Sequence, residues 1–161
     1  MLKVTGFVAA AAVALTIPSY MATAQALGPN AATCEANNSG VLVNIVGFKA
    51  RTGTVRVNLY ANNAATYLEK GKYLRRVEVA VPKNGNVAVC LPASPGTYAV
   101  SVRHDRNGNG KGDMSDGGGF SGNPKVSMLD FALKRKPALS RTAFQVGQTT
   151  ASITVSLRYA G

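Results

Sequence analysis

The residues of this chain whose types and spacing could do chemistry lie together in one short polar segment, residues 105–116. With the first aspartate as position 1, oxygen-bearing side chains fall at positions 1, 3, 5, 9 and 12, and a glycine stands at position 6. This spacing is that of a 12-residue calcium loop, in which alternate residues aim their oxygens at one hard cation. The predicted calcium ligands are Asp105, Asn107, Asn109, Asp113, Asp116 and the backbone carbonyl of Lys111.

Several features of the same loop limit the affinity that calcium would have for it. Asp116 is shorter than the bidentate glutamate usual at position 12, two ligands are neutral amides, and no helices are predicted on either side. Arg103, Arg106 and Lys111 also offset the three carboxylates. We therefore expect weak binding, with a dissociation constant on the order of 0.1 to 1 mM and a structural role. The alternative is a polar surface loop whose Asn and Asp side chains cap their own backbone turns.

No catalytic constellation stands out elsewhere in the sequence. His104 is the only histidine, and no second histidine or free thiol joins it to make a nucleophile pair or a zinc site. The sequence therefore predicts a protein that is not an enzyme and that uses no cofactor other than calcium. A hydrolytic enzyme with a site that the sequence does not reveal stays open as the alternative.

The polar loop follows directly on a run of alternating apolar and polar residues, the pattern of a half-buried β-strand. Seven such runs are predicted to be strands: residues 41–48, 54–61, 76–81, 87–91, 98–104, 142–146 and 153–159. The Asn84-Gly85 pair predicts a tight hairpin between the third and fourth of them. Residues 61–73 suit a short helix or a turn that ends at Gly71. The predicted fold is all-β, an antiparallel β-sandwich of about seven strands, immunoglobulin-like or transthyretin-like.

The N-terminus has the composition of a secretory signal peptide. Lys3 precedes an apolar run over residues 6–17, which is too short for the roughly 20 residues that span a bilayer, and Ala24 and Ala26 form a signal-peptidase site. We expect residues 1–26 to be removed and the product to be periplasmic or secreted, without a lipid or transmembrane anchor. A buried N-terminal helix is the alternative.

The remaining residues, 27–161, have the length of one domain. Residues 27–40 are rich in Ala, Asn and Gly without a repeating apolar pattern and are predicted to be a flexible segment before the sandwich domain, residues 41–161. Cys34 and Cys90, the two cysteines, are predicted to pair in an oxidising compartment. Two separate buried thiols are the alternative.

The chain is strongly basic, and this charge bears on its partners. The formal net charge is +11, and loss of Lys3 with the leader lowers it by one, to about +10. Residues 134–136, with Arg141, form the densest basic patch. Because the basic residues are not interleaved with aromatic ones, we expect no specific nucleic-acid binding. The expected partners are anionic envelope components or another envelope protein, and solubility alone is the alternative role of the charge.

Four short segments together resemble a known bacterial family. They are Leu91-Pro92, Gly96-Thr97-Tyr98-Ala99-Val100, the His104 to Lys111 stretch and Gly119-Phe120-Ser121. The resemblance is to domain of unknown function 2141 and extends from Val41 to Tyr159. It implies an exported protein with a sandwich-like β domain and no assigned activity, so it carries over no catalytic residue. With the leader, it favours a binding or structural module of the cell envelope.

Overall fold

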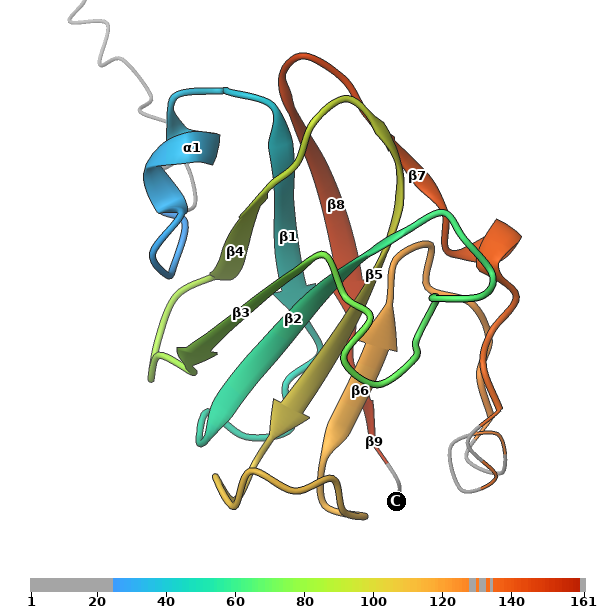
Figure 1. Ribbon diagram of the computed structural model, residues 1–161. Coiled ribbons are helices and arrows are strands. Elements are labelled where there is room, and N and C mark those ends of the chain that lie inside the picture. The colour runs from blue at the N-terminus through green and yellow to red at the C-terminus, as the bar shows by residue number, and fades with distance from the viewer. Residues whose placement is uncertain (1–24, 128–129, 131–132, 134, 160–161) are drawn as a thin grey trace, which may run out of the picture.

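The computed structural model describes residues 25–127, 130, 133 and 135–159 (Figure 1). Residues 1–24 of the predicted signal peptide and Lys134 of the basic patch lie outside the described residues. The described part folds into two β-sheets packed face to face, so the prediction of an all-β sandwich is confirmed. No described helix is both long enough and apolar enough to cross a membrane.

The smaller sheet has the strand order β4-β1-β8. These strands are β4 (Val87–Pro92), β1 (Gly40–Val46) and β8 (Thr150–Ser156). The larger sheet has the order β3-β2-β5-β6-β9, and β7 pairs with the start of β5. Its strands are β3 (Arg75–Ala80), β2 (Thr54–Ala61), β5 (Gly96–Asp105), β6 (Gly117–Phe120), β9 (Arg158–Tyr159) and β7 (Phe144–Val146). All the strand pairings are antiparallel except the parallel pair of β1 and β8.

The core lies between the two sheets and is built from alternate residues of each strand. Val41 and Val43 of β1 and Val55 and Val57 of β2 are completely buried there. Because successive side chains of a strand point to opposite faces, one apolar residue in two is enough to fill this layer. The intervening residues of the larger sheet face outward, and that outer face is where the charged side chains discussed below lie.

The seven predicted strands are present, and β6 is the strand that the sequence did not indicate. Its first three residues are glycines, which give no alternating pattern. A Cβ on Gly117 would lie 2.4 Å from the Tyr159 ring, and one on Gly119 would lie 2.6 Å from a Val155 methyl group. Glycine is therefore required where β6 packs closely against the C-terminal strands. The last predicted strand begins earlier, at Thr150, and is divided into β8 and β9.

The predicted hairpin between the third and fourth strands is wrong. β3 pairs with β2 and β4 pairs with β1, so residues 81–86 cross from one sheet to the other. A tight hairpin turn of that type needs a positive φ at both central residues, and here only Gly85 has one, at +81°. Residues 61–73 were predicted to form a short helix or a turn; after β2 ends at Ala61 they form successive turns.

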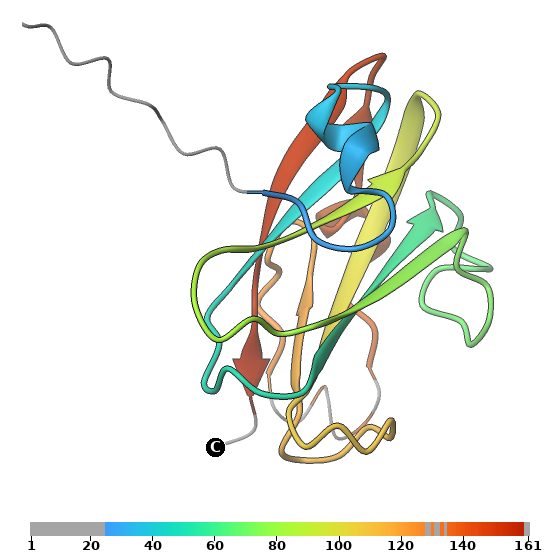
Figure 2. The same ribbon diagram turned by 90° about the vertical axis from the view of Figure 1, so that its left-hand side faces the viewer.

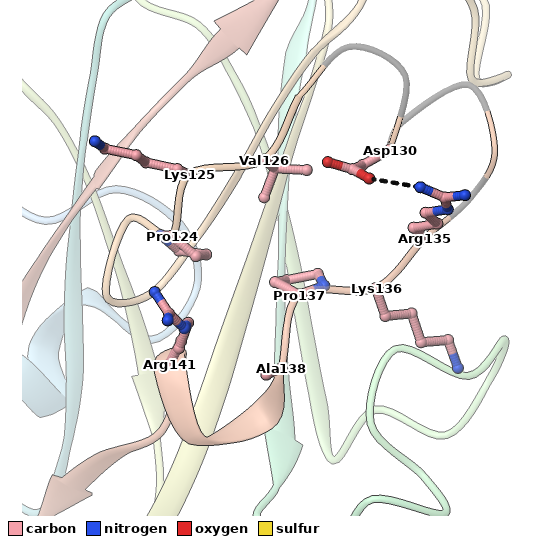
Figure 3. Close-up of a pocket in the computed structure, with 9 residues that line it drawn as sticks. All are labelled: Pro124, Lys125, Val126, Asp130, Arg135, Lys136, Pro137, Ala138 and Arg141. Atoms are coloured by element: carbon pink, nitrogen blue, oxygen red, sulfur yellow. Dashed lines mark ion pairs between the residues drawn. The ribbon is translucent and has the colours of Figure 1, made fainter.

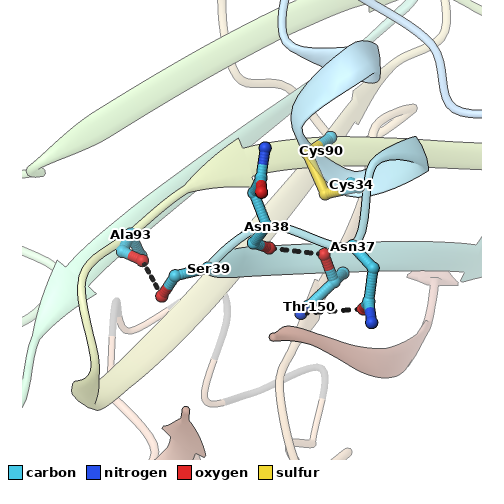
Figure 4. Close-up of a disulfide and its surroundings, with 7 residues drawn as sticks. All are labelled: Cys34, Asn37, Asn38, Ser39, Cys90, Ala93 and Thr150. Atoms are coloured by element: carbon cyan, nitrogen blue, oxygen red, sulfur yellow. Dashed lines mark hydrogen bonds between the residues drawn. A yellow bond between two sulfur atoms is a disulfide. The ribbon is translucent and has the colours of Figure 1, made fainter. Parts of the chain in front are cut away.

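Residues 27–40, expected to lack regular structure, contain the helix α1 (Ala31–Glu35). Figure 2 shows α1 lying over the end of the smaller sheet that carries β4. Leu27 donates its backbone N–H to the Ala88 carbonyl at 2.7 Å, and the predicted disulfide between Cys34 and Cys90 is present with a Cα–Cα distance of 5.9 Å (Figure 4). The segment is therefore fastened along the edge of β4.

Candidate functional site

The polar loop at residues 105–116 begins inside the fold, because Asp105 is the last residue of β5 and only 2% exposed. Its carboxylate accepts the backbone N–H groups of Asn109 and Gly110 at 3.2 and 2.7 Å. Gly108 and Gly110 have φ angles of +68° and +74°, in the left-handed region that glycine adopts without strain. Asp105 thus holds the first half of the loop in a tight turn.

Asp113 organises the second half of the loop. One carboxylate oxygen accepts the side-chain amides of Asn107 and Asn109, each at 2.9 Å. The other oxygen accepts the hydroxyl and the backbone N–H of Ser115 at 2.6 and 2.8 Å. These hydrogen bonds, from Ser115 first, hold the pKa of Asp113 far below its usual range. Hydrogen bonds between side chains therefore bring together three of the six predicted calcium ligands, Asn107, Asn109 and Asp113.

The other side-chain oxygens of the loop differ in whether they accept a hydrogen bond. The amide oxygens of Asn107 and Asn109 accept backbone N–H groups at 3.1 and 2.7 Å, the latter from Lys111. Asp116 keeps one buried oxygen with no hydrogen-bond partner among the described residues. No group of three or more His, Cys, Asp or Glu side chains placed to hold a metal occurs in the described part of the chain. Calcium binding stays a prediction.

His104 lies directly beside this loop and is completely buried. Its Nε2–H donates to the carbonyl of Thr52 at 2.7 Å, because a carbonyl oxygen can only accept. In the neutral tautomer with its proton on Nε2, Nδ1 is an acceptor and receives the hydrogen bond of the Tyr159 hydroxyl at 2.6 Å. Burial raises the pKa of Tyr159, which keeps that hydroxyl protonated. Both ring nitrogens of His104 therefore serve to join β5 to Thr52 and to β9.

A pocket of about 300 Å³ lies in the segment between β6 and β7 (Figure 3). Its charged lining residues are Lys125, Arg135, Lys136, Arg141 and the single carboxylate Asp130. Pro124, Pro137 and Val126 supply apolar walls. The segment is anchored at both ends by Ser121, whose hydroxyl accepts the Val100 N–H at 2.9 Å and donates to the Thr142 carbonyl at 2.5 Å.

The cationic groups of the pocket divide into paired and unpaired ones. Arg135 lies 3.6 Å from Asp130, whose pKa is lowered by hydrogen bonds from Ser127 and by this guanidinium. Lys136 turns away from the pocket toward the 61–73 turns and pairs with Glu69 (Figure 3). Lys125 and Arg141 form no ion pair or side-chain hydrogen bond with any described residue and lie on the opposite side from the Asp130 pair. The pocket therefore carries two uncompensated positive charges.

The sequence indicated part of this pocket. Arg135, Lys136 and Arg141 belong to the predicted basic patch and now line one cavity. Lys125 was missed, because it stands alone before the patch in a stretch with no charge cluster, and only folding brings it opposite Arg141.

Comparison with known families places most of the chain in one bacterial family. A family model described as an uncharacterized protein conserved in bacteria, DUF2141, matches residues 43–154. The chain belongs to this family. The match runs from β1 through the polar loop and the basic pocket to β8, so both features lie within the DUF2141 domain. No curated protein and no solved structure matches the chain.

Proposed function

We propose that this DUF2141 protein is an exported, non-enzymatic binding module of the cell envelope, and that the pocket between β6 and β7 takes an anionic ligand. The observation that carries the proposal is that Lys125 and Arg141, which have no ion pair with any described residue, both line a cavity of about 300 Å³. In a chain with seven acidic residues, two of the carboxylates are already used to neutralise Arg135 and Lys136. The excess charge at Lys125 and Arg141 is left for a ligand.

The chemistry of the two side chains limits which anionic groups the ligand can carry. A guanidinium offers a planar fork that binds both oxygens of a carboxylate or of a phosphate, whereas an ammonium acts as a point charge. A cavity of this volume is at the small end of ligand pockets and holds one anionic group with the unit that bears it. Pro124 and Pro137 provide flat apolar contacts for that unit.

The cellular location supports the same proposal. The disulfide between Cys34 and Cys90 suits an oxidising compartment, in agreement with the predicted leader over residues 1–26. An exported basic protein meets acidic glycans and anionic lipid head groups before it meets nucleic acid. Attraction to these polymers is electrostatic and falls with salt.

The proposal is tested by titrating the mature protein with galacturonate and with inorganic phosphate, followed by NMR chemical shifts. We expect shifts at residues 124–126 and 135–141, and a loss of affinity of about tenfold or more in Lys125→Ala/Arg141→Ala, since each charged hydrogen bond is worth about 1.5 kcal/mol or more. Lys83→Ala, an exposed lysine away from the pocket, is the matched control. Equal affinity of the double variant and the wild type would overturn the proposal.

The hydrolytic alternative receives no support from the geometry of the described residues. Neither nitrogen of His104 is free to take a proton from a substrate, because Thr52 and Tyr159 occupy both.

A further inference from the structure

Three arginines stand in one row across the outer face of the larger sheet. Arg56 of β2 is the register partner of Arg103 of β5, Arg103 is the partner of Gly118 of β6, and Gly118 is the partner of Arg158 of β9. We call Arg56, Arg103 and Arg158 the arginine row. Because neighbouring strands are about 4.8 Å apart, the row spans roughly 14 Å from Arg56 to Arg158.

The alternation of each strand places the row on the outside. In β2 the residues on either side of Arg56 are Val55 and Val57, both completely buried in the core. In β5 Arg103 stands between Val102 and His104, which are also buried. Arg158 is exposed, and Arg56 and Arg103 keep 23% and 27% of their side-chain surface accessible. The three guanidinium groups therefore share one accessible face.

The charge of this face is only partly balanced. Glu78 pairs with Arg56 at 2.5 Å, and Asp105 lies 3.5 Å from Arg103. Arg158 has no ion pair with any described residue, and Arg76, one row further, binds the Asn58 amide rather than a carboxylate. Gly118, which stands between Arg103 and Arg158 in the row, has no side chain to hold an extended ligand away from the sheet.

The arginine row continues into the basic pocket. Gly118, Phe120 and Arg158 line a small cavity of about 10 Å³ together with Pro124 and Val126. Pro124 and Val126 also line the pocket that holds Lys125 and Arg141. The basic pocket therefore adjoins, through these two shared residues, the end of the row at Arg158.

From this continuity we infer that the ligand is a linear acidic polysaccharide, with one anionic group in the pocket and further groups along the arginine row; this inference rests on the proposed function of the pocket. Carboxylate or sulfate groups repeated along a sugar chain match guanidinium forks repeated across a sheet. Single-stranded nucleic acid gains part of its affinity from phosphate contacts and part from bases stacked on successive aromatic side chains. The row presents guanidinium groups and a glycine instead.

The test is a length series on the mature protein, comparing galacturonate with an oligogalacturonide of about six units, since linked contacts raise affinity beyond that of each one alone. We expect the oligomer to bind at least about tenfold more tightly per chain. Arg158→Ala should reduce the oligomer affinity by about fivefold or more and leave galacturonate binding unchanged. Lys83→Ala is again the control, and thermal unfolding verifies that each variant is folded.

The outcomes separate the two proposals. If galacturonate binds in the pocket but the oligomer gains nothing, or Arg158→Ala has no effect, the inference about the row is overturned and the pocket proposal stands. If neither galacturonate nor the oligomer binds, the inference about the row is overturned, and the pocket proposal fails with it when inorganic phosphate does not bind either. Tighter binding of oligothymidylate than of an oligogalacturonide of equal charge would also overturn the assignment to polysaccharide.

Discussion

Tyr159 completes the hydrogen bonding of His104, a group with no access to water. Its hydroxyl donates to Nδ1 of the neutral ring at 2.6 Å, while the Thr52 carbonyl accepts the hydrogen bond of Nε2–H at 2.7 Å. Removing the hydroxyl leaves a buried acceptor unsatisfied, so we expect Tyr159→Phe to lower the free energy of unfolding by about 1 to 3 kcal/mol in urea titrations.

The matched control for this change is Tyr98→Phe. The Tyr98 hydroxyl donates to the Ser94 carbonyl at 2.9 Å at an exposed position, where water replaces the lost bond. We expect it to cost less than about 0.5 kcal/mol. Equal costs for the two substitutions would show that the His104 hydrogen bonds do not contribute specifically to stability.

The sequence identified best those residues whose role depends on neighbours within a few positions along the chain. The Asp and Asn side chains of the 105–116 loop were predicted either to bind calcium or to cap turns, and both roles depend mainly on spacing along the chain. The structure shows the caps directly, at Asp105 and Asp113. Which donors occupy each carboxylate depends on side-chain rotation, which spacing does not determine.

Calcium binding by the polar loop, residues 105–116, can be tested through the stability of the protein. With a dissociation constant of 0.1 to 1 mM, about 5 mM calcium stabilises the folded state by about 1 to 2 kcal/mol through mass action. We therefore expect the thermal unfolding midpoint to be higher in calcium than in EDTA. Asp116→Asn should abolish the difference, because Asp116 holds the buried oxygen that no described residue satisfies.

Asp105→Ala is unsuited to this test, since it removes two backbone caps with or without metal. Asp130→Asn, in the basic pocket, is the control that should keep the calcium response. The same midpoint in calcium and EDTA would identify the loop as one held by its own hydrogen bonds alone.

The strands show where sequence reasoning succeeds at the scale of elements. β2 was predicted to its exact bounds, because its buried valines alternate with polar residues. β6 could not be predicted from the sequence, because its glycines give no alternating pattern. They are required by the close approach of Tyr159 and Val155, which are distant in sequence. The hairpin predicted at Asn84-Gly85 was wrong for a related reason, since tertiary packing determines which strands β3 and β4 pair with.

The candidate binding surface is a property of the whole molecule. Arg135, Lys136 and Arg141 are close in sequence and were predicted as one patch, whereas the arginine row joins residues of β2, β5 and β9. Register alone places Arg56, Arg103 and Arg158 side by side, and a shift of one residue in any strand would turn that arginine inward. Such a surface follows from the sheet topology and cannot be found from sequence spacing.

The disulfide determines how the N-terminal segment contributes to the stability of the whole. Cys34 and Cys90 are 56 residues apart, and closing a loop of that length stabilises the folded state by about 4 kcal/mol in the chain-entropy model. The bond also holds α1, which has five residues and none that is buried, against β4. We therefore expect Cys34→Ala/Cys90→Ala to unfold at a clearly lower urea concentration, with faster amide exchange over residues 27–40.

Two controls make that expectation specific. The wild type in reductant should behave like the double variant, because both lose the same cross-link. The pocket lies in the segment after β6, away from α1 and the edge of β4, so the folded variant should still bind galacturonate with unchanged affinity. If the midpoint were unchanged in the variant, the hydrogen bonds that Leu27 and Ser39 donate and that Asn37 accepts from the Thr150 N–H would be sufficient to hold the segment, and the cross-link would add nothing to stability.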